Sequence, residues 1–480
     1  MFRFSHELIF KSAFSSKKIP GIVKLAREAK IKSNSIIQIL HYWRYKQLTL
    51  LFLAALVLRL SISHLGFHDD IYSNTAWGEW IFKNGPKGFY EASGWIYSSP
   101  TQFPLISLLY GFNHFLYDRL MFLFANMGLW VATYHLAPSK MLWFFDFSTW
   151  FGNSMYQVTP FKFGALISMK VVAILADLAI ASVIYLLAKN HLKKPLLWSL
   201  AYLLSPFSWY LSALWGQYDQ TSFLFLLLAF ILLIRRFLFM APLLLLISVE
   251  LKPTSLIFVP LFLYIYFRLK PKLPEVVIGV VSSIILFAYS ISMFTDRNIF
   301  NFLQGELLPR IFSKSEPRVS TNAFNFWRIF IGNAALNQDT VLFLLPTKVW
   351  GYALFLVTYV ISLKILKVVT AENIFKSLFI IGGGGFLFLT NMLDRYFFPG
   401  VAFLLILTIY QKGLFKYWLI LSFIFWLNLF NQWWFPDSLG ILREILLWQG
   451  SFITRILAGI NVIVFILVLR KYEIKLFQKN

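Results

Sequence analysis

The chain has 480 residues, of which 59% are apolar or aromatic and 14% are charged, whereas a typical soluble domain is about half apolar and about a quarter charged. Its mean hydropathy of +0.68 excludes a disordered chain, and its apolar runs are too long for a soluble enzyme or a membrane barrel. At about 20 residues per crossing, the apolar residues can form at most about fourteen transmembrane helices.

The net charge of +23 would indicate a nucleic-acid partner in a soluble protein. Here the basic residues lie in short segments between apolar runs, as in the cytoplasmic loops of membrane proteins, so we expect membrane lipids and no nucleic acid as partners. The chain has no cysteine, which excludes disulfides and thiolate chemistry. Residues 1–46 are basic and lack a signal-peptide core with a cleavage site, which predicts a cytoplasmic N-terminal segment.

Apolar runs that can cross a bilayer follow one another along the rest of the chain. They predict an all-α polytopic membrane protein with roughly 12 to 14 transmembrane helices. The runs lie at about 47–63, 103–117, 120–136, 165–189, 195–213, 219–234, 238–250, 254–268, 274–294, 341–364, 374–391, 396–411, 415–431 and 452–469.

The positive-inside rule gives an independent test of this threading. With the N-terminus in the cytoplasm, nearly every cytoplasmic turn is basic, and the C-terminus is also cytoplasmic. These turns are Asp118-Arg119, His191–Lys194, Arg235-Arg236, Arg268–Lys272, Lys364–Lys367, Lys412–Lys416 and Arg470-Lys471. The external segments are then about 64–102, 135–164, 215–219, 250–253, 295–340, 391–396 and 432–451. Two long loops on one face indicate that the protein acts at the external surface of the cell membrane.

The first external loop begins with two adjacent carboxylates, Asp69 and Asp70, and is rich in aromatic residues such as Trp77. An ionised Asp can act as a general base by taking a proton from an attacking hydroxyl. An aspartate at a membrane surface is more often simply solvated, and Trp side chains there are usually interface anchors. The pattern alone leaves both interpretations open.

Two later turns place polar groups between apolar helices. Gln217, Tyr218 and Asp219 follow Trp215-Gly216, and such groups should face a wet cavity or a ligand because their unpaired burial is costly. Lys252 lies between two short apolar runs, where it can hold a phosphate or pair with Glu250.

Farther along, Asp394, Arg395 and Tyr396 mark another external turn. Arg395 can clamp a phosphate or pair with a nearby acid. Within the apolar runs, Lys170 and Asp177 are two helical turns apart, and either helix packing or ligand contact explains them. No close spacing of His and carboxylates indicates a metal site.

Five of these features, in their order along the chain, resemble the GT-C superfamily of integral-membrane glycosyltransferases. The likeness runs from about residue 47 to 411 and is greatest to mannosyltransferase-like members that depend on dolichyl- or polyprenyl-phosphate sugars. It is carried by Asp70 with Trp77-Gly78 and Gly85–Tyr90, then by Trp215–Asp219, Leu251–Pro253, Asn322–Trp327 and Asp394–Pro399.

The resemblance implies transfer of a hexose, mannose or glucose, from a polyprenyl-phosphate donor to an acceptor hydroxyl on the extracytoplasmic side, with inversion. Asp70 would be the catalytic base, with Asp69 as the alternative, and Lys252 and Arg395 would neutralise the donor phosphate. The remaining implied substrate-binding residues are Gln217, Tyr218, Asp219, Trp77, Asp394 and Tyr396. Relatives often have His-Glu-Arg-Tyr where this chain has Leu393–Tyr396, which leaves the role of that turn open.

The resemblance also implies a domain plan. Residues 1–46 form the cytoplasmic segment, residues 47–411 form a GT-C-like catalytic domain whose first external loop carries short amphipathic helices, and residues 412–480 add C-terminal helices with a basic tail. The lipid-linked sugar donor is itself a substrate, so no further cofactor is required. Some superfamily members use a divalent metal, but the sequence offers no clear ligand set. The acceptor is a glycolipid, a glycan or a protein.

Two other functions fit the composition. In a transporter or lipid flippase, Arg59, Lys170 and Asp177 would line a translocation path. The large external loops and the lack of an internal repeat speak against it. A polymerase or ligase would share the external site but would use a lipid-pyrophosphate donor.

Overall fold

The computed structural model describes residues 47–66, 68–95, 98–126, 160–313, 317–332, 334–342 and 344–477. The chain divides into two compact units, Met1–Ala55 and Leu56–Asn480. In the first unit the description starts at Gln47, where an apolar helix begins that ends at Ile62. The basic segment 1–46 and most of the aromatic segment at about 135–164 therefore lie outside the described residues. The predicted domain boundary at residue 411 stays a prediction.

Long apolar helices dominate the described part of the chain. Five have the length and composition to cross a membrane: Ile167–Lys189, Leu273–Ser292, Thr347–Ile365, Lys412–Trp433 and Asp437–Lys471. Strands in the same residues are limited to two two-stranded pairs. Helices suit a bilayer because they satisfy their backbone hydrogen bonds internally. The expectation of an all-α membrane protein is confirmed at this level, and the number of 12 to 14 crossings stays a prediction.

The N-terminal helices of the second unit are α3 (Asp69–Asn84), α4 (Pro104–Asn126) and α8 (Pro160–Lys189). α3 packs on α4, and α4 packs on α8. The turn expected at Asp118-Arg119 is wrong, because α4 continues through both residues. The two charges pair with each other on the helix surface, with Arg119 Nη2 3.1 Å from Asp118 Oδ2, and neither residue breaks a helix.

A group of shorter helices follows, and it ends with the longer helix α14. They are α9 (Leu196–Leu204), α10 (Pro206–Trp209), the π-helix η1 (Tyr210–Trp215), α11 (Asp219–Ile234), α12 (Ala241–Leu251), the 3-10 helix η2 (Pro253–Phe258), α13 (Val259–Arg268) and α14 (Leu273–Ser292). Gly216 ends η1 with a φ of 78°, a left-handed conformation that glycine adopts without strain. α14 exposes Ile284 and Ile285 at 61% and 62%, as expected for a helix face in contact with lipid.

Short elements connect α14 to the C-terminal helices. They are α15 (Ile299–Phe302), η3 (Leu303–Leu307), α16 (Leu308–Ser313), β1 (Ser320–Thr321), α17 (Phe326–Ile331), β2 (Val341–Leu342) and β3 (Leu345–Pro346). β1 pairs in parallel with β4 (Met392–Leu393), with Ser320 opposite Met392 and Thr321 opposite Leu393. β2 pairs antiparallel with β3. The β1–β4 pair ties the long segment 295–340 to the turn at 391–396.

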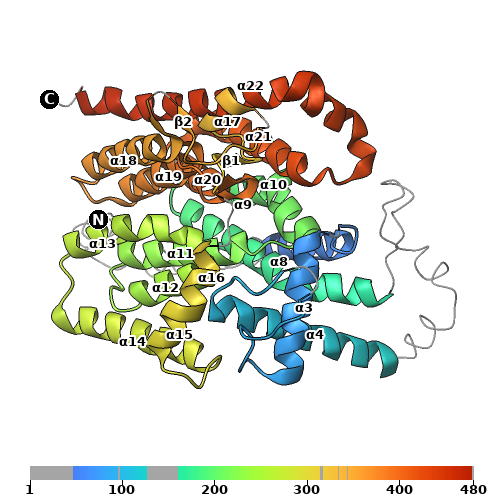
Figure 1. Ribbon diagram of the computed structural model, residues 1–480. Coiled ribbons are helices and arrows are strands. Elements are labelled where there is room, and N and C mark those ends of the chain that lie inside the picture. Colours follow the sequence, from blue (N-terminus) through green and yellow to red (C-terminus); the bar gives the residue numbers. More distant parts are fainter. Residues whose placement is uncertain are drawn as a thin grey trace, which may run out of the picture. The chain divides into compact units, whose positions relative to one another are not determined.

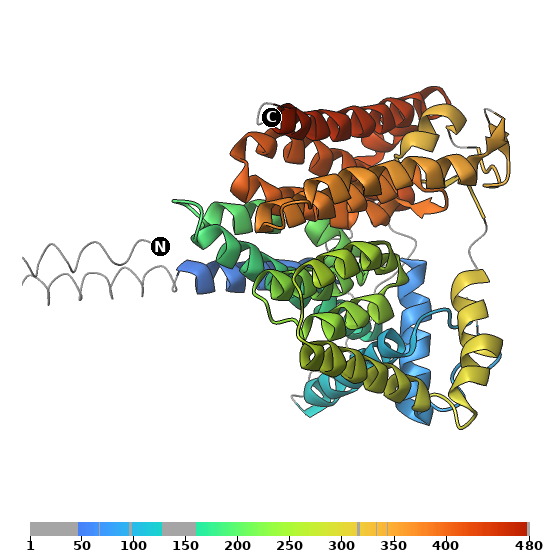
Figure 2. The same ribbon diagram turned by 90° about the vertical axis from the view of Figure 1, so that its left-hand side faces the viewer.

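The C-terminal helices lie side by side in Figure 1, and Figure 2 shows the same neighbours from another direction. They are α18 (Thr347–Ile365), α19 (Ala371–Phe388), η4 (Asp394–Phe397), α20 (Phe398–Tyr410), η5 (Lys412–Leu414), α21 (Phe415–Trp433), η6 (Asp437–Leu439) and α22 (Gly440–Phe477). α19 and α20 approach closely at glycines: a Cβ on Gly400 would lie 2.9 Å from the backbone N of Gly383. η4 comes directly before α20, so this packing also fixes the position of Asp394 and Arg395.

Candidate active site

One cavity of about 1080 Å³ collects residues from segments that are far apart in the chain. Its walls come from the end of the first loop, the turn after η1, the turn after α12, the segment 311–338 and the turn at 389–396. These are largely the segments that the charge pattern assigns to one side of the membrane. We call this space the polar cavity. Of the predicted site residues, Gln217, Tyr218, Lys252, Arg395 and Tyr396 line it.

Asp70, at the start of α3, is not among the cavity-lining residues but contacts two of them, Gln217 and Arg395. His68 caps this helix, and its Nδ1 accepts the backbone N–H of Asp70 at 3.1 Å. The Asp70 side chain is 40% exposed, and its Oδ2 accepts a 2.6 Å hydrogen bond from Gln217 Nε2. Arg395 Nη2 is 4.0 Å from the same oxygen. Burial tends to raise the pKa of Asp70, but Arg395 and the hydrogen bonds outweigh it and lower the pKa.

Lys252, which lines the cavity, forms an ion pair with Asp219 behind it. The Nζ–Oδ1 distance is 2.6 Å, and the side chains are 15% and 5% exposed. Asp219 is the first residue of α11, where the helix dipole favours a carboxylate. Lys252 Nζ also lies 5.2 Å from the centre of the Tyr396 ring. Burial lowers the pKa of Lys252, and Asp219 partly opposes this shift. The Lys252 ammonium therefore lines the cavity, and the Asp219 carboxylate balances its positive charge.

Arg395 lies between two carboxylates. Its guanidinium is 4.0 Å from both Asp70 and Asp394, and it lies 5.5 Å from the centre of the Trp215 ring. The Asp394 side chain is fully buried and receives no hydrogen bond of normal geometry from the described residues. Burial raises the pKa of Asp394 to about 7, although Arg395 opposes the shift. Burial lowers the pKa of Arg395, but Asp70 and Asp394 more than compensate and raise it.

Two predicted residues have buried roles. Tyr218 lines the cavity, and its hydroxyl donates to the Met169 carbonyl at 3.0 Å while its ring meets Tyr110 edge to face. Trp77 is 4% exposed in a hydrophobic cluster, donates to the Ser98 carbonyl at 3.1 Å and is not among the cavity-lining residues. The Asp69 side chain lies outside the described part of the chain, so its comparison with Asp70 stays a prediction.

Sequence reasoning missed several residues of the cavity wall, among them Thr101, Arg318, Gln338 and Thr390. Arg318 carried a usable signal, because it is a basic residue in a segment that the charge pattern predicts to be external, where Lys and Arg are disfavoured. Thr390 bonds Gln338 through their side chains at 3.1 Å, a contact between residues 52 apart that no local pattern indicates. In the described residues, no group of three or more His, Asp or Glu side chains could hold a metal ion.

Neither the protein-family models nor the curated proteins give a match to this chain. The likeness to the GT-C superfamily therefore rests on motifs within the sequence and stays a prediction. The geometry of the polar cavity is independent of that likeness. Two cations, Lys252 and Arg395, line the cavity, and the carboxylate Asp70 lies 4.0 Å from Arg395.

Proposed function

We propose that the chain is a membrane glycosyltransferase of the GT-C type, which transfers a hexose from a polyprenyl-phosphate donor to an acceptor hydroxyl on the extracytoplasmic side. The observation that carries this proposal is the convergence at the polar cavity. Asp70, Gln217, Lys252 and Arg395 come from four separate segments, yet Asp70 contacts Gln217 directly and Arg395 across 4.0 Å. Lys252 and Arg395 line one cavity with Gln217.

The two cations fit a phosphate leaving group. A polyprenyl-phosphate sugar carries one negative charge on its phosphate diester, and the departing lipid phosphate gains a second as the bond to the sugar breaks. Preorganised cations stabilise such developing charge without reorganisation at the moment of reaction. Arg395 offers a planar fork of donors and Lys252 a compact charge. The carboxylates of Asp70, Asp219 and Asp394 offset the positive charge of these two cations.

Asp70 has the properties of a general base. Its lowered pKa keeps the carboxylate ionised at neutral pH, and 40% exposure leaves it open to an acceptor. In the proposed step the acceptor oxygen attacks the anomeric carbon, the bond from that carbon to the phosphate oxygen breaks, and the acceptor proton passes to Asp70. A single displacement inverts the anomeric carbon. Gln217 holds one oxygen of Asp70, which leaves the other for the acceptor.

The intramembrane charges support this proposal over transport. Arg59 Nε lies 3.1 Å from Asp177 Oδ2, and both side chains are at most 1% exposed. Lys170 Nζ donates to three backbone carbonyls. None of the three lines the polar cavity. A translocation path requires charged groups that face the transported molecule, whereas these groups are occupied by the protein itself.

A transfer assay tests the proposal. Purified protein in liposomes receives radiolabelled polyprenyl-phosphate mannose or glucose, and the wild type is compared with Asp70→Asn. We expect transfer to fall by about 10²- to 10⁴-fold, because the amide cannot take a proton. Asp296→Asn is the matched control, since this carboxylate is 79% exposed and pairs with Lys87 outside the cavity.

Three other outcomes contradict parts of the proposal. Full transfer by Asp70→Asn removes the assignment of the base. Transfer only from a lipid-pyrophosphate donor favours a polymerase or ligase. No transfer from any lipid-linked sugar, together with movement of the labelled lipid across the bilayer, favours a flippase.

A further inference from the structure

Lys170 is a fully buried lysine in the N-terminal half of α8. Among the described residues it forms no ion pair with a carboxylate. Its Nζ instead donates to three backbone carbonyls, those of Ser63 and Gly66 at 2.6 Å and that of Leu214 at 2.5 Å. An ammonium has three donors, so these bonds use all of them. Lys170 therefore has no donor left for a ligand.

The three carbonyls belong to two chain segments that lead to the site. Ser63 and Gly66 follow the helix that ends at Ile62 and precede Asp70, and Leu214 precedes Gly216 and Gln217. Helix ends leave carbonyl groups without intrahelical donors. Lys170 supplies donors to such carbonyls from both segments at once. The Lys170 side chain thus joins the segment that leads to Asp70 to the segment that leads to Gln217.

The two segments are in close contact around Lys170. A Cβ on Gly66 would lie 2.6 Å from the Leu214 carbonyl oxygen. A Cβ on Gly216 would lie 2.7 Å from Ile71 Cδ1 and 2.8 Å from Lys170 Cγ. The two segments therefore approach each other more closely at these glycines than a residue with a Cβ would allow.

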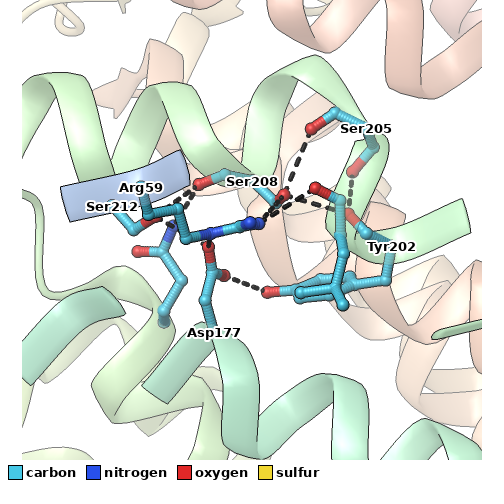
Figure 3. A network of polar contacts seen from close by, with 8 residues as sticks. Arg59, Asp177, Tyr202, Ser205, Ser208 and Ser212 are labelled. Atoms are coloured by element: carbon cyan, nitrogen blue, oxygen red, sulfur yellow. Dashed lines mark hydrogen bonds and ion pairs between the residues drawn. The ribbon is translucent and has the colours of Figure 1, made fainter. Parts of the chain in front are cut away.

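The second buried charge of α8 forms a separate network, shown in Figure 3. Asp177 Oδ2 accepts from Arg59 Nε at 3.1 Å and from the Ser212 hydroxyl at 2.7 Å, and Tyr202 donates to Oδ1 at 2.6 Å. Arg59 also reaches the hydroxyl of Ser208. This network lies seven residues farther along α8 and contacts Tyr202, Ser208 and Ser212, which precede Leu214. It makes no hydrogen bond to Ser63, Gly66 or Leu214, so its removal tests the loss of buried charges while the carbonyl contacts of Lys170 stay in place.

We propose that Lys170 is a positioning residue that sets the contact between Asp70 and Gln217. It acts by holding the two segments through their carbonyls and does not touch a substrate. The activity part of this proposal rests on the proposed glycosyl transfer, whereas the geometric part does not. A misplacement of about 1 Å at a catalytic group can cost about 100-fold in rate, which is why such a tether matters.

The geometric part can be tested without any activity. Because the chain has no cysteine, Asp70→Cys with Gln217→Cys gives one defined thiol pair. Disulfide formation under copper–phenanthroline is followed by the loss of thiols that react with maleimide. We expect Lys170→Met to slow cross-linking by about tenfold or more and Lys170→Arg to recover most of the rate. The control adds Arg59→Met and Asp177→Met to the same double-cysteine protein. It should form the disulfide at close to the rate of the double-cysteine protein with Lys170 intact.

The activity part is tested with the cysteine-free chain. Lys170→Met should lower kcat for sugar transfer by about 10- to 100-fold with KM for the donor unchanged, and Lys170→Arg should restore kcat. Where Lys170→Met fails to fold, Lys170→Gln replaces it; its amide keeps only two of the three donors and is shorter, so a smaller but measurable slowing of cross-linking is expected.

Parent-like cross-linking in the folded Lys170 variant overturns the proposal. Equal slowing in the Arg59/Asp177 control also overturns it, because it would show a general effect of buried charges. If the wild type itself transfers no sugar, the proposed function fails, and the cross-linking result still decides the role of Lys170.

Discussion

At the scale of single residues, the site is governed by charges that are buried together. Asp394 is fully buried, lies 4.0 Å from Arg395 and has a pKa raised to about 7 by burial. Asp70 faces the same guanidinium from the exposed side and has a lowered pKa. The pKa values of two carboxylates around one arginine are thus shifted in opposite directions, because Asp70 also accepts a hydrogen bond from Gln217 whereas neither oxygen of Asp394 has such a partner among the described residues.

The pKa of Asp394 predicts a pH dependence of stability. The folded state holds this proton more tightly than the unfolded state, whose pKa is about 3.8. The contribution to stability is therefore complete below about pH 3.8 and is lost as the pH rises through about 7. As the pH rises from 5 to 8, the unfolding temperature of the wild type should fall by a few degrees more than that of Asp394→Asn. Asp296→Asn should follow the wild type, and parallel curves for all three proteins would refute the shift.

The Lys252–Asp219 pair allows stability to be separated from donor binding. Lys252→Met leaves a largely buried carboxylate without its cation, which should cost about 3 kcal/mol of unfolding free energy. Adding Asp219→Asn should recover most of that loss, because no unpaired charge remains. If Lys252 holds the donor phosphate, the double variant still has a KM for the donor raised by about tenfold or more. Recovery of both stability and KM would show that Lys252 serves only the ion pair.

At the scale of elements, the site depends on helix ends brought together by close packing. Gln217 follows η1, Lys252 caps α12, and Asp70 stands in the first turn of α3. Such ends leave backbone groups unpaired within their own helix, so polar side chains gather there. The close contact of α19 with α20 at Gly383 and Gly400 fixes the position of η4, which contributes Arg395 to the cavity wall.

Gly400→Leu tests this packing. The new side chain would begin 2.9 Å from the Gly383 backbone, so the two helices must separate, and we expect a loss of about 1–3 kcal/mol of unfolding free energy. Sugar transfer should fall as well, because Arg395 moves with η4. Gly459→Ala is the control, since nothing lies within 4 Å of the added carbon in helix α22. Equal unfolding temperatures for the two variants would contradict the close contact.

At the scale of the whole molecule, local patterns predicted the class of structure and the polar turns. The apolar excess indicated an α-helical membrane protein, and the turns at 215–219, 250–253 and 391–396 all contribute to the polar cavity. The sequence was wrong at Asp118-Arg119, because a charged pair resembles a loop although it sits on a helix surface. It left Lys170 open between packing and ligand contact, since its partners are backbone carbonyls, which have no signature in the side-chain pattern.

The sequence by itself determined that this chain belongs in a membrane and which short segments carry the polar groups, because hydropathy and charge are sums over neighbouring residues. Only the tertiary structure decided which of those groups meet. Asp70 accepts a hydrogen bond from Gln217 across 147 residues, and Arg395, from a turn much later in the chain, lies 4.0 Å from the same carboxylate oxygen. Trp77, for which the family resemblance implies a role in substrate binding, lies at 4% exposure in a hydrophobic cluster, and its role stays a prediction. Contacts of this kind depend on how the helices pack, and that is set by the whole chain rather than by any one segment.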